Sequence, residues 1–159
     1  MFKINDYVIY DIYGVCKILD IEINEKTEKK FYILKPLHQN LTTKTLVNND
    51  QVSMRKILSK DEVKTLIEDM PEVEPIWIKD VKQRRKKFKE LLKTGRCRDL
   101  LRVIKTIYLK TKERKNQGQK ITVTDKEILE TAKKQLYDEF SFVLNIPIKQ
   151  VESYILARL

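Results

Sequence analysis

Residue types on which enzymes and metal sites depend are scarce in this 159-residue chain. It has one histidine, His38, and two cysteines, Cys16 and Cys97, which lie far apart in the sequence. CxxC, HExxH, GxxxxGKS/T and GxSxG motifs are all missing. No acidic or cysteine residue stands next to His38, and the carboxylate pair Glu72 and Glu74 lies in a proline-bounded linker where nothing would shift a pKa. The sequence therefore predicts no catalytic residue, no metal site and no cofactor.

Long apolar runs are missing too. No stretch approaches the roughly 18 apolar residues that a bilayer-spanning helix needs. Met1-Phe2-Lys3 leads into polar sequence rather than into the apolar region of a signal peptide. Two widely separated cysteines are typical of thiols in a reducing compartment. We therefore expect a cytoplasmic protein with no membrane partner and no small-molecule substrate.

Acidic residues are scarce in one part of the chain. Residues 76–120 hold 17 Lys/Arg and 4 Asp/Glu, whereas the formal net charge of the whole chain is +10. A solvated helix face would mix Glu among its lysines, but a concentrated basic stretch is typical of a surface that binds phosphates. The charge favours nucleic acid over anionic lipid, because the apolar face of this segment is needed for the core.

The first part of the chain has the pattern of short strands. Five β-prone runs are separated by turn residues such as Gly14 and Asn48-Asn49-Asp50. The runs are residues 7–10, 15–23, 31–34, 43–47 and 52–57. Pro36 follows the third run and marks its end, because proline cannot donate to a strand ladder. Five short strands predict a small SH3- or Tudor-like β-barrel over residues 1–57.

The rest of the chain has helical periodicity. Ser59 and Thr124 each precede a Glu by three residues, which predicts a capping box at two helix starts. Helices are expected after Ser59, over residues 77–93 and 98–116, after Thr124 and after Pro147. The sequence thus predicts an α+β protein, with a β-barrel over residues 1–57 and an all-α domain of about five helices over residues 59–159.

The expected helix over residues 77–93 repeats lysine along one face. Its lysines recur at spacings of three and four, at Lys79, Lys82, Lys86, Lys89 and Lys93, with Arg84 and Arg85 beside them. Like charges in line repel by a few tenths of a kcal/mol per pair. A phosphate backbone would offset this repulsion by releasing counterions. No helix-turn-helix or zinc-finger pattern is present, so we expect binding that depends on shape rather than on sequence.

Trp77, the only tryptophan, has two interpretations. At a helix start it can be a core residue or a hydrophobic staple. Exposed at the entry of a basic helix, it can wedge against or stack on a base. The sequence leaves both open.

Several motifs together resemble one known family. The residues that carry the resemblance are FKINDYVIYDIYGV at 2–15, YIL at 32–34, Trp77, LKTG at 92–95, IKTIYL at 104–109 and AKKQLYDE at 132–139. These stretches are similar to the CarD/CdnL family of bacterial transcription regulators over essentially the whole chain. The N-terminal domain of that family is shared with transcription-repair coupling factors.

The resemblance implies a function. The Tudor-like domain would bind the β subunit of RNA polymerase, and the helical domain would lie on promoter DNA at the upstream edge of the transcription bubble, largely independent of sequence. A tryptophan wedge in the minor groove would stabilise the open complex. The implied DNA-binding residues are Trp77 as the wedge and Lys79, Lys82, Arg84, Arg85, Lys86 and Lys89 as backbone contacts.

The resemblance also indicates a polymerase-binding surface. Positions that the family often fills with arginine carry Glu22 and Thr45 here, with Lys26 and Lys44 nearby. These four residues are the expected polymerase contacts. An RNA-binding or ribosome-associated module is the alternative function, since a small barrel with a basic helix also suits structured RNA.

Overall fold

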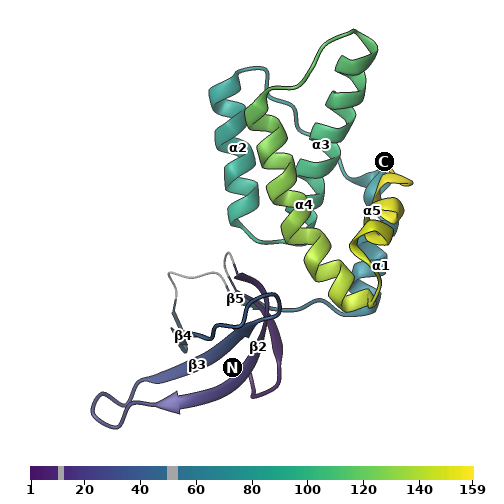
Figure 1. Cartoon of the computed structure of the whole chain (residues 1–159). Helices are drawn as coiled ribbons and strands as arrows, with labels where there is room; N and C mark the ends of the chain where they lie inside the picture. The colour runs from purple at the N-terminus through teal and green to yellow at the C-terminus, as the bar shows by residue number, and fades with distance from the viewer. Residues whose placement is uncertain (11–12, 50–53) are drawn as a thin grey trace. The chain divides into compact units, whose positions relative to one another are not determined.

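The computed structural model describes residues 1–10, 13–49 and 54–159. They form two compact units, Met1–Leu58 and Ser59–Leu159. The first unit is built from strands and the second from helices (Figure 1). The predicted α+β class is confirmed.

Within the described residues, the first unit holds a five-stranded antiparallel sheet in the order β4-β3-β2-β1-β5. Its strands are β1 (Tyr7–Tyr10), β2 (Gly14–Ile23), β3 (Lys30–Pro36), β4 (Thr43–Leu46) and β5 (Met54–Lys56). The first four strands follow one another across the sheet, and β5 returns to pair with the free side of β1. Strand β3 ends at Pro36, as predicted. Residues 50–53, in which the fifth predicted run begins, lie outside the described residues.

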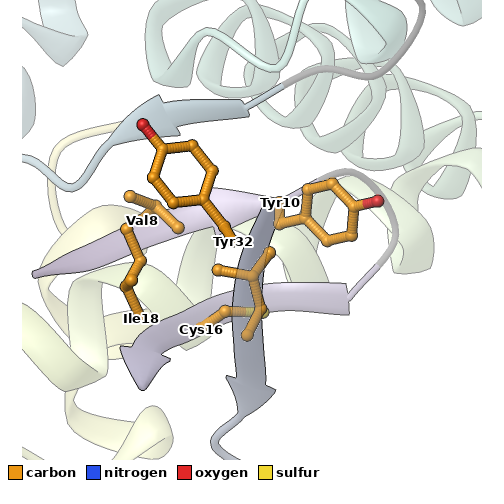
Figure 2. Close-up of a cluster of buried hydrophobic side chains, with 6 residues drawn as sticks. Val8, Tyr10, Cys16, Ile18 and Tyr32 are labelled. Carbon is orange, nitrogen blue, oxygen red and sulfur yellow. The ribbon is translucent and has the colours of Figure 1, made fainter. Parts of the chain in front are cut away.

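One face of the sheet carries a small core. Its buried residues are Val8, Tyr10, Cys16, Ile18, Tyr32 and Leu34 (Figure 2). They come as pairs two residues apart on three neighbouring strands, because alternate side chains of a strand point to the same face. The Tyr32 hydroxyl lies at the rim and accepts a hydrogen bond from the backbone N–H of Phe2 at 3.0 Å.

The second unit is helical. Its elements are α1 (Lys60–Glu68), the 3₁₀ turn η2 (Met70–Glu72), α2 (Val81–Lys93), α3 (Cys97–Asn116), α4 (Val123–Leu144) and α5 (Ile148–Leu156). Helices α2, α3 and α4 lie side by side (Figure 1). No helix in the described part of the chain has both the length and the apolarity to span a membrane.

The direction of the three central helices decides which ends meet. Arg84, in the second turn of α2, pairs with Asp125 in the first turn of α4. Cys97 begins α3, and its thiol donates to Glu139, late in α4, at 3.2 Å. Helices α2 and α4 are therefore parallel and α3 is antiparallel to α4, so the C-terminal end of α3 lies beside the N-terminal ends of the other two (Figure 1).

One predicted helix start is confirmed. The Ser59 hydroxyl accepts from the backbone N–H of Glu62 at 3.1 Å, and the Glu62 carboxylate accepts from the backbone N–H of Ser59 at 3.2 Å. This is the reciprocal capping box expected at α1.

Two other predicted helix starts are wrong. Helix α4 begins two residues before the expected position, because Thr122 rather than Thr124 caps it and accepts from the backbone N–H of Asp125 at 3.1 Å. Helix α2 begins at Val81 rather than at Trp77, because the Asp80 carboxylate accepts from the backbone N–H of Gln83 at 2.8 Å and fixes the first turn there.

Candidate nucleic-acid interface

Helix α2 separates its basic side chains from its buried ones. Its buried face consists of Arg84, Phe88 and Leu91, at the i, i+4, i+7 spacing of a core-facing stripe. The exposed basic side chains are Lys82, Arg85, Lys86, Lys89 and Lys93, which we call the α2 row. Lys79 is also exposed but precedes the helix. The α2 row therefore offers solvent a continuous positive surface.

Trp77 lies in a segment without regular secondary structure, residues 73–79, which hydrogen bonds from α3 and α2 hold in place. The Arg102 guanidinium donates to the Glu74 carbonyl at 3.0 Å. The backbone N–H of Ile76 donates to the Thr106 hydroxyl at 2.9 Å, and this hydroxyl in turn donates to the Arg102 carbonyl at 2.7 Å. Helix α3 thus holds the segment immediately before Trp77.

Arg84 holds the segment immediately after Trp77. Its Nη1 donates to the carbonyls of Ile78 at 2.9 Å and Lys79 at 3.2 Å. Its guanidinium carbon lies 4.0 Å from the centroid of the Trp77 ring, within cation–π distance. The conformation around Trp77 is therefore fixed from both helices.

The expectation that Arg84 contacts a DNA phosphate does not fit this geometry. Arg84 is 2% exposed. Its Nε and Nη2 donate to the two carboxylate oxygens of Asp125 at 3.2 and 2.8 Å, and its remaining terminal nitrogen serves the two carbonyls described above. Asp125 is also buried and accepts from the Thr122 hydroxyl at 2.8 Å. All three guanidinium nitrogens of Arg84 already donate within the protein, so Arg84 has a structural role beneath the exposed surface.

Trp77 is neither a core residue nor freely exposed. It is half-buried, and two cations of α3 approach it in addition to Arg84. Lys110 Nζ lies 5.1 Å and the Arg114 guanidinium carbon 5.4 Å from the ring centroid. The ring therefore lies partly exposed with three cations around it.

The sequence patterns do not identify Lys110, Arg114 and Asp125 as residues of this site. The first two were counted in the basic block, but only the fold shows that they reach Trp77. The signal available in the sequence was the short connection around Gly95, which makes α2 and α3 antiparallel neighbours and brings the end of α3 to the start of α2. Arg84 shares a core-facing spacing with Phe88 and Leu91, but this spacing does not identify Asp125 as its partner.

The four expected polymerase contacts do not all lie on one surface. Lys44 of β4 and Glu22 of β2 form an ion pair at 2.9 Å and are each about half exposed. Lys44 Nζ also lies 4.7 Å from the centroid of the Phe31 ring. Lys26 lies in the turn between β2 and β3, where its backbone N–H donates to the Asn24 side chain at 2.9 Å.

Thr45 differs from the other three. It is 5% exposed and pairs with the buried Tyr32 in the ladder between β3 and β4. Because neighbouring residues of a strand face opposite sides, Thr45 points to the core while Lys44 points to solvent. A direct side-chain contact from Thr45 to a partner does not fit this placement.

The described residues carry little other chemistry. Within residues 1–10, 13–49 and 54–159, no group of three His, Cys, Asp or Glu side chains is arranged to hold a metal ion. Cys16 and Cys97 are both buried thiols. Burial raises the pKa of the Cys16 thiol to about 11, which disfavours its reactive thiolate at neutral pH.

Comparison with known protein families covers nearly the whole chain. Residues 2–58 match the CarD-like/TRCF RID domain, and residues 62–156 match the CarD C-terminal domain. The two matches meet where the strand-rich unit gives way to the helical one. A search of curated proteins finds no match.

Proposed function

The chain belongs to the CarD family, and we propose that it bridges the β subunit of RNA polymerase and promoter DNA and stabilises the open complex. The resemblance seen in the sequence is confirmed, together with the Tudor-like character of the first unit. The family domains mark a transcription regulator that interacts with RNA polymerase, and they are not known as enzymes. The β subunit, the promoter DNA and the open complex belong to the proposal.

The α2 row is the observation that carries DNA binding. Its five cations are exposed, and they project from a helix whose opposite face is fixed in the core by Arg84, Phe88 and Leu91. A row of cations on a fixed helix suits a phosphate backbone, which is itself a regular row of charges. The row presents flexible lysines rather than paired base-reading groups, so binding tolerates any sequence.

The position of Trp77 supports the wedge role. An aromatic ring that unstacks a base step must resist being pushed back, and hydrogen bonds to α3 and to Arg84 hold the residues on both sides of this ring. Such a ring contributes about 1–3 kcal/mol against a base. The gain arises where bases are already parted or kinked, as at the edge of a bubble.

The first unit supplies the polymerase contact in this proposal. Glu22 and Lys44 form an exposed pair at the β4 side of the sheet, and Lys26 lies in the neighbouring turn. Charged side chains on a small surface favour a modest interface of micromolar rather than nanomolar affinity. Thr45 is left out, because its side chain faces the core.

Charge reversal on α2 tests the proposal. Lys82→Glu with Lys86→Glu should weaken binding to every duplex about equally, because phosphate contacts carry no sequence information. The matched control is Lys60→Glu with Lys64→Glu, two exposed lysines with the same spacing on α1. Equal weakening by both pairs would show that the effect follows net charge, and a loss confined to particular sequences would indicate base reading.

Tighter binding to structured RNA than to duplex DNA, with no capture of polymerase, would favour the RNA-binding alternative.

A further inference from the structure

The C-terminal half of α3 carries two cations that converge on the candidate wedge. Lys110 and Arg114 are four residues apart, so they share one face of the helix. Both lie within 5.4 Å of the Trp77 ring centroid. Each is partly exposed, which leaves its charge within reach of a ligand.

The charge balance around Trp77 is uneven. The charge of Arg84 is matched by the bidentate contact with the buried Asp125. Lys110 has a partner in Glu113 at 3.2 Å, but that carboxylate is 55% exposed, so the pair contributes little. Arg114 donates to the carbonyl of Lys120 at 3.2 Å, and the part of the chain that the structure describes gives it no ion pair.

Two like charges at this spacing repel by a few tenths of a kcal/mol. Cation–π contacts at exposed sites return about 0.5–1 kcal/mol. They hold both cations beside the ring without neutralising either of them. An anion that reaches this position therefore gains two cations that are already ordered, and a nucleic-acid strand whose base meets Trp77 brings such an anion with it.

We propose that Lys110 and Arg114 form a second phosphate-binding site, which holds the backbone of the strand that Trp77 contacts. The DNA surface then extends beyond the α2 row onto α3, with Trp77 packed against the α3 pair. The inference rests on the proposed DNA binding and adds a contact that the α2 row does not provide. It also explains why three cations surround one ring, an arrangement that packing alone does not require.

The salt dependence of binding tests the proposal on the full chain. Each phosphate contact contributes about 0.9 to the slope of log K against log salt concentration on duplex DNA. The probe is a duplex that carries a short unpaired bubble, because only there does a base meet Trp77; on single-stranded segments each contact contributes about 0.7. On this probe, Lys110→Gln with Arg114→Gln should therefore reduce the magnitude of the slope by about 1.4–1.8. The charge-conserving variant Lys110→Arg with Arg114→Lys should keep the wild-type slope. Lys60→Gln with Lys64→Gln on α1, at the same spacing, should also keep it, provided that circular dichroism shows all variants folded.

The outcomes separate this inference from the function on which it rests. A wild-type slope in the Lys110/Arg114 double variant, with salt-dependent binding intact, overturns the second site and leaves the α2 row in place. A wild-type protein without salt-dependent DNA binding overturns both. An equal reduction in the α1 control overturns the inference as well, because the effect then follows net charge rather than position.

Discussion

Arg84 and Asp125 form a buried bidentate ion pair that joins α2 to α4, with nitrogen–oxygen distances of 2.8 and 3.2 Å. The guanidinium carbon of Arg84 lies 4.0 Å from the Trp77 ring centroid. Its Nη1 donates hydrogen bonds to the carbonyls of Ile78 and Lys79, the two residues after Trp77. Its neighbour Arg85 is exposed and donates to the Thr124 hydroxyl at 3.0 Å. Adjacent arginines of one sequence motif therefore have different environments: Arg84 is buried beside the tryptophan, and Arg85 is exposed on the α2 row that we propose binds DNA.

This difference predicts opposite phenotypes for two neighbouring substitutions. Arg84→Gln should lower the free energy of unfolding by about 3–5 kcal/mol, because it leaves the Asp125 carboxylate buried without its partner. Arg85→Gln should change it by no more than about 0.5 kcal/mol. Urea unfolding followed by circular dichroism measures both. Greater destabilisation by Arg85→Gln would contradict the assignment.

For DNA binding, the substitution of Arg85 should have the larger effect and the substitution of Arg84 the smaller one. Loss of Arg85 should reduce the magnitude of the salt slope by about 0.9, as expected for one phosphate contact. Loss of Arg84 should leave the slope unchanged in the folded protein, since its guanidinium is already committed to Asp125 and to carbonyls.

Fluorescence reports directly on the environment of Trp77, because the chain has one tryptophan. Arg84→Lys keeps the charge but loses the planar group that lies over the ring and the bidentate contact with Asp125. Acrylamide should therefore quench Trp77 more strongly in Arg84→Lys than in the wild type. Arg85→Lys is the matched control and should leave quenching unchanged. Equal quenching in all three proteins would show that Arg84 does not hold the ring.

Stability of the first unit should fall in alkali through Cys16. Burial raises the pKa of this thiol in the folded state to about 11. The unfolded thiol loses its proton near its ordinary pKa of about 8.5. The stability contributed by the protonated thiol is thus complete below that pH and decreases by about 1.4 kcal/mol per pH unit until the folded thiol also ionises.

A Cys16→Ala variant isolates this effect from other groups that titrate in alkali. The difference in unfolding free energy between the wild type and the variant should stay constant at neutral pH and shrink as the pH rises toward 11. A difference that stays constant throughout would show that the thiol is not the group responsible.

Polymerase binding should depend on the exposed pair at the β4 side of the sheet. Lys44→Glu should weaken capture of purified polymerase core by the full chain, without changing the salt slope on duplex DNA. Stability should change by less than about 1 kcal/mol, because an exposed ion pair contributes little. Lys56→Glu on β5, also exposed, is the control for charge. Equal loss of polymerase capture in both variants, or no loss in either, would show that Lys44 is not part of the polymerase-binding surface.

Sequence patterns predicted the secondary structure well where a residue pattern was compatible with one local backbone structure only. The β-prone runs predicted β1, β2 and β3, and the Ser59 capping box marked the start of α1. The errors occurred where one polar side chain had two possible roles. The expected helix over residues 77–93 includes Asp80, yet the Asp80 carboxylate caps α2 and leaves Trp77 outside the helix.

The site could be predicted only in part, because spacing along one helix does not give the partner of a buried charge. The lysine pattern identified most of the exposed α2 row. It could not show that Arg84 would turn inward to Asp125, which lies 41 residues later. The same limit applies to Lys110 and Arg114, which reach Trp77 only because α3 returns alongside α2.

The lifetime of open promoter complexes is the most direct test of the central claim. Complexes formed by purified polymerase with and without the protein are challenged with a competitor, and their decay is followed for the wild type and for Trp77→Ala. The wild type should lengthen the lifetime. Trp77→Ala should lose this effect by about tenfold for each ~1.4 kcal/mol of wedge contact, while its duplex affinity and salt slope stay close to those of the wild type. A wild type that leaves the lifetime unchanged, or a folded Trp77→Ala that protects the complexes equally well, would contradict the account.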